Sequence, residues 1–262
     1  MKIRSIWKVC ELFGVSADKK IPVNDYLDIF FGHSVEHHNG WGLALLDDGQ
    51  ISVEKEPVRA VDSMYLKNRL TGKITTSRCM AHIRKATVGD VSFSNTHPFV
   101  QSDNSGRKWV FVHNGTVFES KETNRYIFVQ EGTTDSERVL LYIIERINQA
   151  AIEGLDDEKK IRVIEDVVLR LTPGNKLNFL LYDGDYMYVH KNEPGTLYRT
   201  VSHGTAVFST HPLDDQFWEE VPQNRLLVYR DGELIHEAQP HVNTYYHNEE
   251  KMRLQYLDHA ML

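Results

Sequence analysis

Two cysteines are the first candidates for chemistry in this chain, because a cysteine thiolate is a strong nucleophile. Cys10 lies near the start of the sequence beside Glu11, and no histidine adjoins it. A lone cysteine is more often a small buried apolar residue than a nucleophile. Cys79 fits that rule, since it stands beside Met80 in a strand-like run and is expected in the core. Cys10, taken alone, fits either interpretation.

Three short polar clusters offer further candidates: residues 81–89, 112–115 and 133–137. Each also has an ordinary structural interpretation. His82 and Arg84 alternate as on a solvent-facing strand, and Asn114-Gly115 has the composition of a hairpin turn. Asp135 is an acid of the kind that helix N-termini favour. Taken one at a time, these clusters indicate no particular activity.

Thirteen histidines raise the question of a metal site, and the densest group is His33 with the run Glu36-His37-His38. The sequence contains neither zinc-type pairs of Cys and His nor a His-Glu-x-x-His motif. We therefore expect no bound metal. The glycine patterns of phosphate loops and dinucleotide sites are absent too, so we expect no cofactor.

Charge and composition exclude several classes of protein. Thirty Lys and Arg against 37 Asp and Glu give a net charge of −7, which argues against a nucleic-acid binder. Apolar residues make up 41%, as is typical of a soluble globular protein. No apolar run approaches the roughly 20 residues that a membrane-spanning helix needs, so no membrane partner is expected. Two cysteines are too few for a disulfide framework, and we expect a cytoplasmic protein.

Four segments have the pattern of β-hairpins, in which strand-forming runs flank a tight turn that ends in glycine. The expected turns are Asp48-Gly49, Asn114-Gly115, Asp183-Gly184 and Asp231-Gly232. A further strand is expected over residues 74–83. Several runs, such as residues 179–182, are apolar on both alternations, which indicates strands covered on both faces.

Three helices have clear start signals, at Asn24, at Thr134 and at Asp156 or Asp157. The second has the form of a capping box, with Glu137 three residues after Thr134. Strands come first, then two consecutive helices, then strands again. This order predicts two stacked antiparallel sheets with helices outside, an α+β fold, and not a doubly wound parallel sheet. The segment after about Glu237 is not assigned to any element.

Six segments, taken in order, resemble the class II glutamine amidotransferases, and most closely their stand-alone bacterial members. The segments are CELFG (10–14), NGWG (39–42), HIRKAT (82–87), NTHPF (95–99), HNG (113–115) and TDSE (134–137). The similarity covers roughly Cys10 to Leu234. It implies the N-terminal nucleophile hydrolase fold, a four-layer αββα sandwich, which agrees with the layers expected above.

The resemblance implies a cysteine nucleophile at the mature N-terminus whose own α-amine is the general base. An α-amino group has a pKa of about 7.7–8, so it can exchange a proton near neutral pH. The Cys10 sulfur would attack the side-chain amide of glutamine, release ammonia and leave a γ-glutamyl thioester that water hydrolyses. By the same resemblance, the Asn114 amide and the Gly115 N–H would donate to the oxyanion.

The resemblance also assigns the substrate contacts. Arg84 would hold the α-carboxylate, for which a planar guanidinium fork is suited, and Asp135 would pair with the α-ammonium. Thr87 would add a contact, whereas His97 matches a motif position without a chemical step. The expected substrate is therefore glutamine or another γ-glutamyl compound with a free amino-acid head.

Two departures from the family pattern shape the expected organisation. Nine residues precede Cys10, so we expect residues 1–9 to be a removable leader and residues 10–262 to form a single glutamine amidotransferase domain. Val88 stands where the large synthetase members often have His. Since no acceptor domain is recognised, we expect hydrolysis, with any acceptor or synthetase on a separate protein.

Two alternatives remain open at this point. The chain could hydrolyse another γ-glutamyl amide, peptide or thiol conjugate, with only the leaving group changed. It could also be a non-catalytic binding or regulatory module that keeps residues 1–9.

Overall fold

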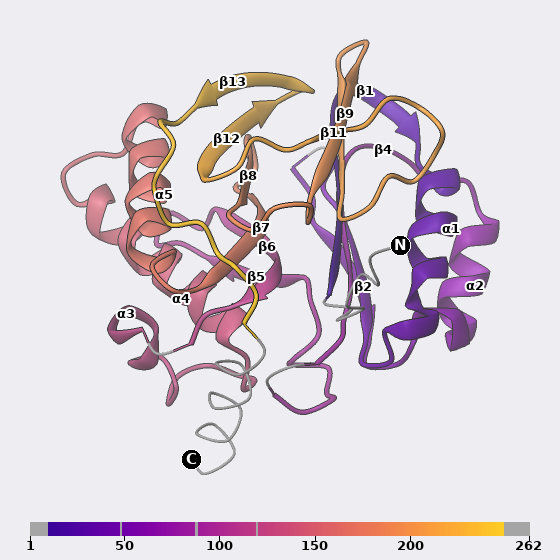
Figure 1. Cartoon of the computed structure of the whole chain (residues 1–262), viewed down its shortest axis with the longest axis horizontal. Helices are drawn as coiled ribbons and strands as arrows, with labels where there is room; N and C mark the ends of the chain where they lie inside the picture. The colour runs from indigo at the N-terminus through magenta and orange to yellow at the C-terminus, as the bar shows by residue number, and fades with distance from the viewer. Residues whose placement is uncertain (1–9, 48, 87–88, 119, 249–262) are drawn as a thin grey trace.

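The computed structural model describes residues 10–47, 49–86, 89–118 and 120–248, and two antiparallel sheets form its centre (Figure 1). Sheet A has seven strands in the order β11-β9-β10-β1-β4-β2-β3, and sheet B has six in the order β13-β12-β8-β7-β6-β5. The strands of sheet A are β1 (Glu11–Pro22), β2 (Trp41–Leu45), β3 (Ser52–Glu56), β4 (Thr75–Ile83), β9 (Tyr198–Ser202), β10 (Thr205–Ser209) and β11 (Glu219–Glu220). The strands of sheet B are β5 (Phe99–Ser102), β6 (Lys108–Thr116), β7 (Lys176–Tyr182), β8 (Met187–Lys191), β12 (Arg225–Arg230) and β13 (Glu233–Glu237).

Helices cover the two outer faces, as Figure 1 shows. Against sheet A lie α1 (Asn24–Gly32) and α2 (Met64–Thr71), together with the short 3₁₀ turns η1 (His33–Glu36) and η2 (Ala60–Asp62). Against sheet B lie α4 (Asp135–Ala151) and α5 (Asp157–Leu171), with the short α3 (Lys121–Asn124) beside α4. The expected four-layer αββα sandwich is therefore confirmed.

Alternation along the strands divides the core into three apolar clusters. Phe13 of β1 packs toward the helices over sheet A, whereas its neighbour Leu12 points to the midplane between the sheets. On β7, Phe179 packs toward α4 and α5 and Leu180 points to the same midplane. Such strands are apolar on both faces because both faces are covered, as the pattern of residues 179–182 predicts. The sheets approach closely at Gly14, where a Cβ would stand 2.5 Å from Leu180 Cδ1.

Three of the four expected hairpins are present. Strands β2 and β3, β7 and β8, and β12 and β13 are antiparallel neighbours, and the last two pairs are joined at the predicted turns. Asp48 of the first predicted turn lies outside the described residues. In the last of these turns Asp231 and Gly232 have φ of 51° and 80°. Positive φ at both central residues is the mark of a type I′ turn.

The fourth expected hairpin, at Asn114-Gly115, is wrong. Strand β6 runs unbroken to Thr116, and neither Asn114 nor Gly115 has a positive φ. The two residues pair in register with Asn178 and Leu177 of β7. The glycine is required for a different reason: a Cβ on Gly115 would lie 2.1 Å from the main-chain oxygen of Lys176.

The helix starts follow the expected capping at two of three sites. Thr134 Oγ1 accepts the Glu137 N–H at 3.3 Å, and Asp156 caps α5. The Glu137 carboxylate does not complete a reciprocal box, since it accepts the N–H groups of residues 131 and 132. Asn24 is not the cap of α1. Its side chain instead accepts the Ile74 N–H and donates to main-chain oxygens at the end of α2, which joins the two helices.

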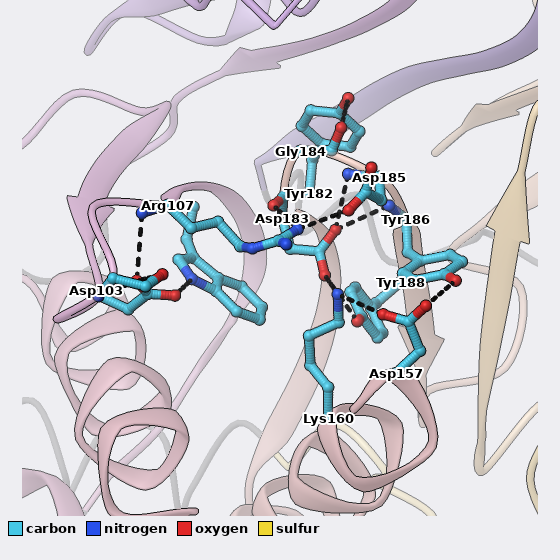
Figure 2. A network of polar contacts seen from close by, with 12 residues as sticks. Asp103, Arg107, Asp157, Lys160, Tyr182, Asp183, Gly184, Asp185, Tyr186 and Tyr188 are labelled. Atoms are coloured by element: carbon cyan, nitrogen blue, oxygen red, sulfur yellow. Dashed lines mark hydrogen bonds and ion pairs between the residues drawn. The ribbon is translucent and has the colours of Figure 1, made fainter. Parts of the chain in front are cut away.

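A buried ion pair fixes α5 to the turn between β7 and β8 (Figure 2). Lys160 Nζ lies 2.5 Å from the carboxylate of Asp183, and that aspartate is fully buried. The same carboxylate accepts the Tyr188 hydroxyl and two turn N–H groups. Across the described ranges, no helix combines the length and apolarity needed to cross a membrane.

Candidate active site

The apolar midplane becomes polar at one end of the sandwich. Side chains two residues apart on a strand share a face, so the midplane positions of Met80, Val112 and Leu180 continue into polar side chains. These are His82 on β4, Asn114 on β6, and Asn178 and Lys176 on β7. Cys10 stands two residues before the midplane residue Leu12. Side chains from both sheets thus face the same end of the midplane, which is called the gap below.

The thiol of Cys10 contacts the main chain just after β4. Its Sγ donates to the Lys85 oxygen at 3.3 Å and accepts the Lys85 N–H at 3.4 Å. Burial raises the pKa of this thiol; the Lys85 N–H and the nearby cations Arg84 and Lys176 oppose that effect, and Asp135 adds to it. The Cys10 side chain is half-buried, so this residue is not an enclosed core cysteine. Cys79, by contrast, is fully buried, as expected.

Arg84 is buried beside the thiol and does not lie on a solvent-facing strand. Its guanidinium donates to the main-chain oxygens of Asp90 at 2.9 Å and Gly89 at 3.1 Å. Its exposed fraction is 3%, and that of His82 is 0%. The solvated-face interpretation of both residues is therefore wrong, because β4 is a central strand whose two faces are covered.

Asn114 presents a buried amide to the gap. Its side chain is 1% exposed, and neither its Nδ2 nor its Oδ1 has a hydrogen-bond partner among the described residues. A buried unpaired amide costs about 1–3 kcal/mol, so such groups are rare unless a ligand or water completes them. The next residue, Gly115, brings its main chain against Lys176 without an intervening side chain.

Asp135 occupies the first turn of α4 and is 5% exposed. Its Oδ2 accepts the Val117 N–H at 2.7 Å, just past the end of β6. The charge of Asp135 acts on both Cys10 and Arg84, so the three groups lie within electrostatic reach of one another. Thr87 and residues 1–9 lie outside the described residues, so the contact and the leader expected there stay predictions.

Three buried histidines underlie the site, and the sequence analysis assigned no chemical role to them. The rings of His82 and His97 stack at 4.1 Å between centroids, and His113 Nδ1 lies 3.0 Å from Ser136 Oγ. Burial lowers the pKa of all three, that of His82 to about 3. They are therefore neutral near pH 7. The alternation of His82 with Arg84 was the available signal, but it does not distinguish a buried face from an exposed one.

Lys176 is the second group that the sequence analysis missed. It is 5% exposed, and its Nζ lies 2.7 Å from the Glu193 carboxylate. A charged residue at the head of the mostly apolar run KLNFLLY was the signal that could have identified it, because charges are rarely buried without a partner.

The histidine-rich segment lies on the other side of Cys10. His33 Nδ1 is 2.8 Å from the carboxylate of Glu11, and His37 and His211 approach that carboxylate within 3.7 and 3.8 Å. Glu11 is 5% exposed. No group of three His, Cys, Asp or Glu side chains in the described part of the chain is arranged to hold a metal ion.

Comparison with known proteins indicates the family of this chain. The sequence model of the class II glutamine amidotransferases matches residues 9–204. The chain is 30% identical over 261 residues to the uncharacterised protein MJ1515 of Methanocaldococcus jannaschii, covering 87% of this chain and 71% of that protein. It is 25% identical to a Haemophilus influenzae protein named "Putative glutamine amidotransferase", covering 88% and 87% of the two chains.

Solved structures agree on the fold. The glutamine phosphoribosylpyrophosphate amidotransferase of B. subtilis superposes with a TM-score of 0.67 at 16% identity, over 90% of this chain and 50% of that one. At this identity the likeness shows the shared fold. Since the family model matches three quarters of the sequence, the chain belongs to the class II glutamine amidotransferases.

Proposed function

We propose that this chain hydrolyses the γ-amide of glutamine through a γ-glutamyl thioester on Cys10. The observation that carries the proposal is the meeting of three groups at one end of the midplane. These are a half-buried thiol, an arginine within its electrostatic reach, and an asparagine amide that has no partner among the described residues. Family membership supplies the chemical class.

The proposed first step is attack by sulfur. The Sγ proton passes to the α-amine of Cys10, and the thiolate bonds to the amide carbon of glutamine. The oxyanion formed accepts from Asn114 Nδ2 and the Gly115 N–H. Collapse of the intermediate breaks the C–N bond, and the α-ammonium returns its proton to the leaving amide nitrogen, which departs as ammonia. Water then attacks the thioester, releases glutamate and restores the thiol.

An α-amine suits the base role better than the buried histidines do. A general base works best when its pKa lies near the operating pH, and the pKa of His82 is lowered to about 3. The two described partners of the Cys10 sulfur are both main-chain atoms of Lys85. The proposal therefore requires a free α-amine at Cys10, which means that residues 1–9 are removed. The remaining residues 10–262 are proposed to form a single domain.

The substrate head is proposed to lie between Arg84, Asp135 and Thr87. Arg84 reads the α-carboxylate and Asp135 the α-ammonium, so simple amides are excluded. Any acceptor of the ammonia is proposed to be a separate protein, and the compartment to be the cytoplasm, in keeping with the two free cysteines.

The test combines an N-terminal mass with an assay. Native protein beginning at Cys10 is expected to release glutamate and ammonia in equal amounts from L-glutamine. Cys10→Ala is expected to reduce this to background, and Cys79→Ala, which alters only a core thiol, to retain activity. A form in which Cys10 directly follows the initiator Met supplies the free amine independently. Equal ammonia release by that form and by Cys10→Ala would refute the proposal, whereas a preference for another γ-glutamyl amide would change the substrate alone.

A further inference from the structure

We propose that Lys176 is a second cation of the nucleophile site, which stabilises the thiolate of Cys10 and is held in place by Glu193. The inference deepens the proposed function, because it rests on Cys10 being the nucleophile. Lys176 forms no bond to the substrate in this proposal; it acts through the sulfur.

Strand geometry places Lys176 on the correct face. Strand β7 pairs with β6 in an unbroken register in which Asn178 lies opposite Asn114 and Lys176 opposite Thr116. Leu180, on the same face of β7, belongs to the cluster between the sheets. Lys176 therefore extends this midplane row beyond the Asn114 amide, into the end of the gap where Cys10 lies.

The lysine is buried and its position is fixed. A buried ammonium is unfavourable unless it is paired, and the Glu193 carboxylate lies 2.7 Å from its Nζ. Glu193 is held in turn, since its main-chain oxygen accepts the Thr196 hydroxyl at 2.6 Å and Thr196 accepts the Asn178 amide at 2.8 Å. The charge thus stays inside the protein and does not reach out to bulk water.

The charges that face the Cys10 sulfur come from three elements. Arg84 at the end of β4 and Lys176 on β7 favour the thiolate, and Asp135 on α4 disfavours it. Lys176 also acts on His113, which burial keeps neutral, and Glu193 offsets part of its charge. In the proposed complex the substrate carboxylate neutralises Arg84. Lys176 is then the cation left to favour negative charge on sulfur.

The chemical role follows from this placement. A nearby cation lowers the pKa of a thiol and increases the fraction present as thiolate. The Sγ proton passes to the α-amine as described above, and Lys176 takes no part in that transfer. The same charge favours the thiolate when it departs from the thioester carbonyl in the hydrolysis step. Lys176 is therefore expected to accelerate both half-reactions.

The test is the pH dependence of Cys10 alkylation in the full chain. Iodoacetamide is the reagent because it is neutral and is not steered by local charge, and the Cys10 peptide is quantified by mass. Lys176→Met is expected to raise the midpoint of the profile by about one pH unit, which is about tenfold slower alkylation below the midpoint. Lys176→Arg is expected to stay near the wild type, and Glu193→Gln to lower the midpoint.

Lys191→Met is the matched control. Lys191 is buried like Lys176, lies in the same sheet and pairs with a glutamate, Glu220. It is expected to reduce stability without moving the Cys10 profile. A folded Lys176→Met with an unchanged midpoint, or an equal shift in Lys191→Met, would overturn the inference. Should Lys176→Met not fold, an unchanged midpoint in Glu193→Gln would overturn it equally.

The proposed function and this inference fail separately. Alkylation needs no glutamine and no free α-amine, so a shifted profile in a chain without glutaminase activity supports Lys176 and refutes only the reaction. Glutaminase activity that depends on Cys10, with an unmoved profile in Lys176→Met, supports the reaction and refutes the role of Lys176.

Discussion

His82 Nε2 lies 3.2 Å from the main-chain oxygen of His113, and this contact joins β4 of one sheet to β6 of the other. A carbonyl oxygen can only accept, so Nε2 carries the proton and Nδ1 of the neutral ring does not. Because His113 directly precedes Asn114, the contact holds the proposed oxyanion donor Asn114 close to the strand that leads to Arg84.

The buried histidines make the fold sensitive to acid. The folded-state pKa of His82 is about 3, below its ordinary value of about 6.5. The unfolded chain therefore binds more protons between these values, so this contribution to stability is complete above about pH 6.5 and is lost as the pH falls toward 3. His82→Gln is expected to make the free energy of unfolding fall less steeply with acid, by about 1.4 kcal/mol per pH unit. Urea titrations at several pH values measure this, and His203→Asn, at an exposed turn, should keep the wild-type slope.

Asn114→Ala is expected to lower kcat for glutamine by about 10²–10³ while KM changes little, since the donor acts on the oxyanion and not on the ground state. Steady-state kinetics on protein with a free Cys10 amine test this. A variant that raised KM alone would assign Asn114 to substrate binding instead.

Gly115→Ala is expected to destabilise the fold by about 2–4 kcal/mol and to abolish turnover, because the added methyl group meets main chain that cannot move aside. The Cβ would lie 2.1 Å from the Lys176 oxygen and 2.3 Å from His113 Nε2. Gly72→Ala, whose Cβ comes no nearer than 3.6 Å to another atom, is the control. Equal melting temperatures for the two variants would contradict the steric argument.

Asp135→Asn tests recognition of the substrate head. The amide keeps an oxygen that can accept the Val117 N–H, so the fold should persist. Loss of the charge is expected to lower kcat/KM for glutamine by about 10–100-fold, in line with about 1.5–3 kcal/mol for a charged hydrogen bond. N-acetylglutamine, which lacks the ammonium, is expected to be a weaker substrate, and its turnover should be hardly affected by the variant. An equal decrease for both substrates would remove Asp135 from the head site.

Asp183→Ala should unfold more easily than any surface ion-pair variant. It leaves the Lys160 ammonium, 4% exposed, without its buried partner (Figure 2), and breaking such a pair costs about 3–5 kcal/mol. The exposed pair of Arg162 and Glu158 is the contrast, and Glu158→Ala should change the free energy of unfolding by less than about 0.5 kcal/mol. Similar values for the two variants would show that the buried pair adds little.

The layers of the fold could be predicted from sequence because they follow from local periodicity. The run 179–182 is apolar on both alternations, and it proves to lie between a helical layer and the second sheet. Thr134 has an extended backbone conformation and caps α4, as its side chain favours. Cys79 is buried because it lies in a strand whose two faces are covered, as its place beside Met80 in a strand-like run predicts.

The errors arise where a distant strand decides the local structure. Asn114-Gly115 has the composition of a turn, but glycine is required there because the main chain of Lys176, about sixty residues later, approaches closely. Asn24 has cap composition, but its side chain binds the segment beyond α2. Burial of Arg84 likewise depends on strands from other parts of the chain, and no local pattern indicates it.

The proposed nucleophile and oxyanion donors stand on opposite sheets, so their separation is set by side-chain packing between the sheets and by contacts such as that of His82 with His113. That packing is tight enough at Gly14 to leave no room for a methyl group before Leu180. The rate of the proposed reaction is therefore expected to depend on the spacing between sheets A and B. Hydrostatic pressure, or a single carbon added to a side chain deep in the sandwich, is expected to slow the proposed reaction under conditions in which the protein stays folded.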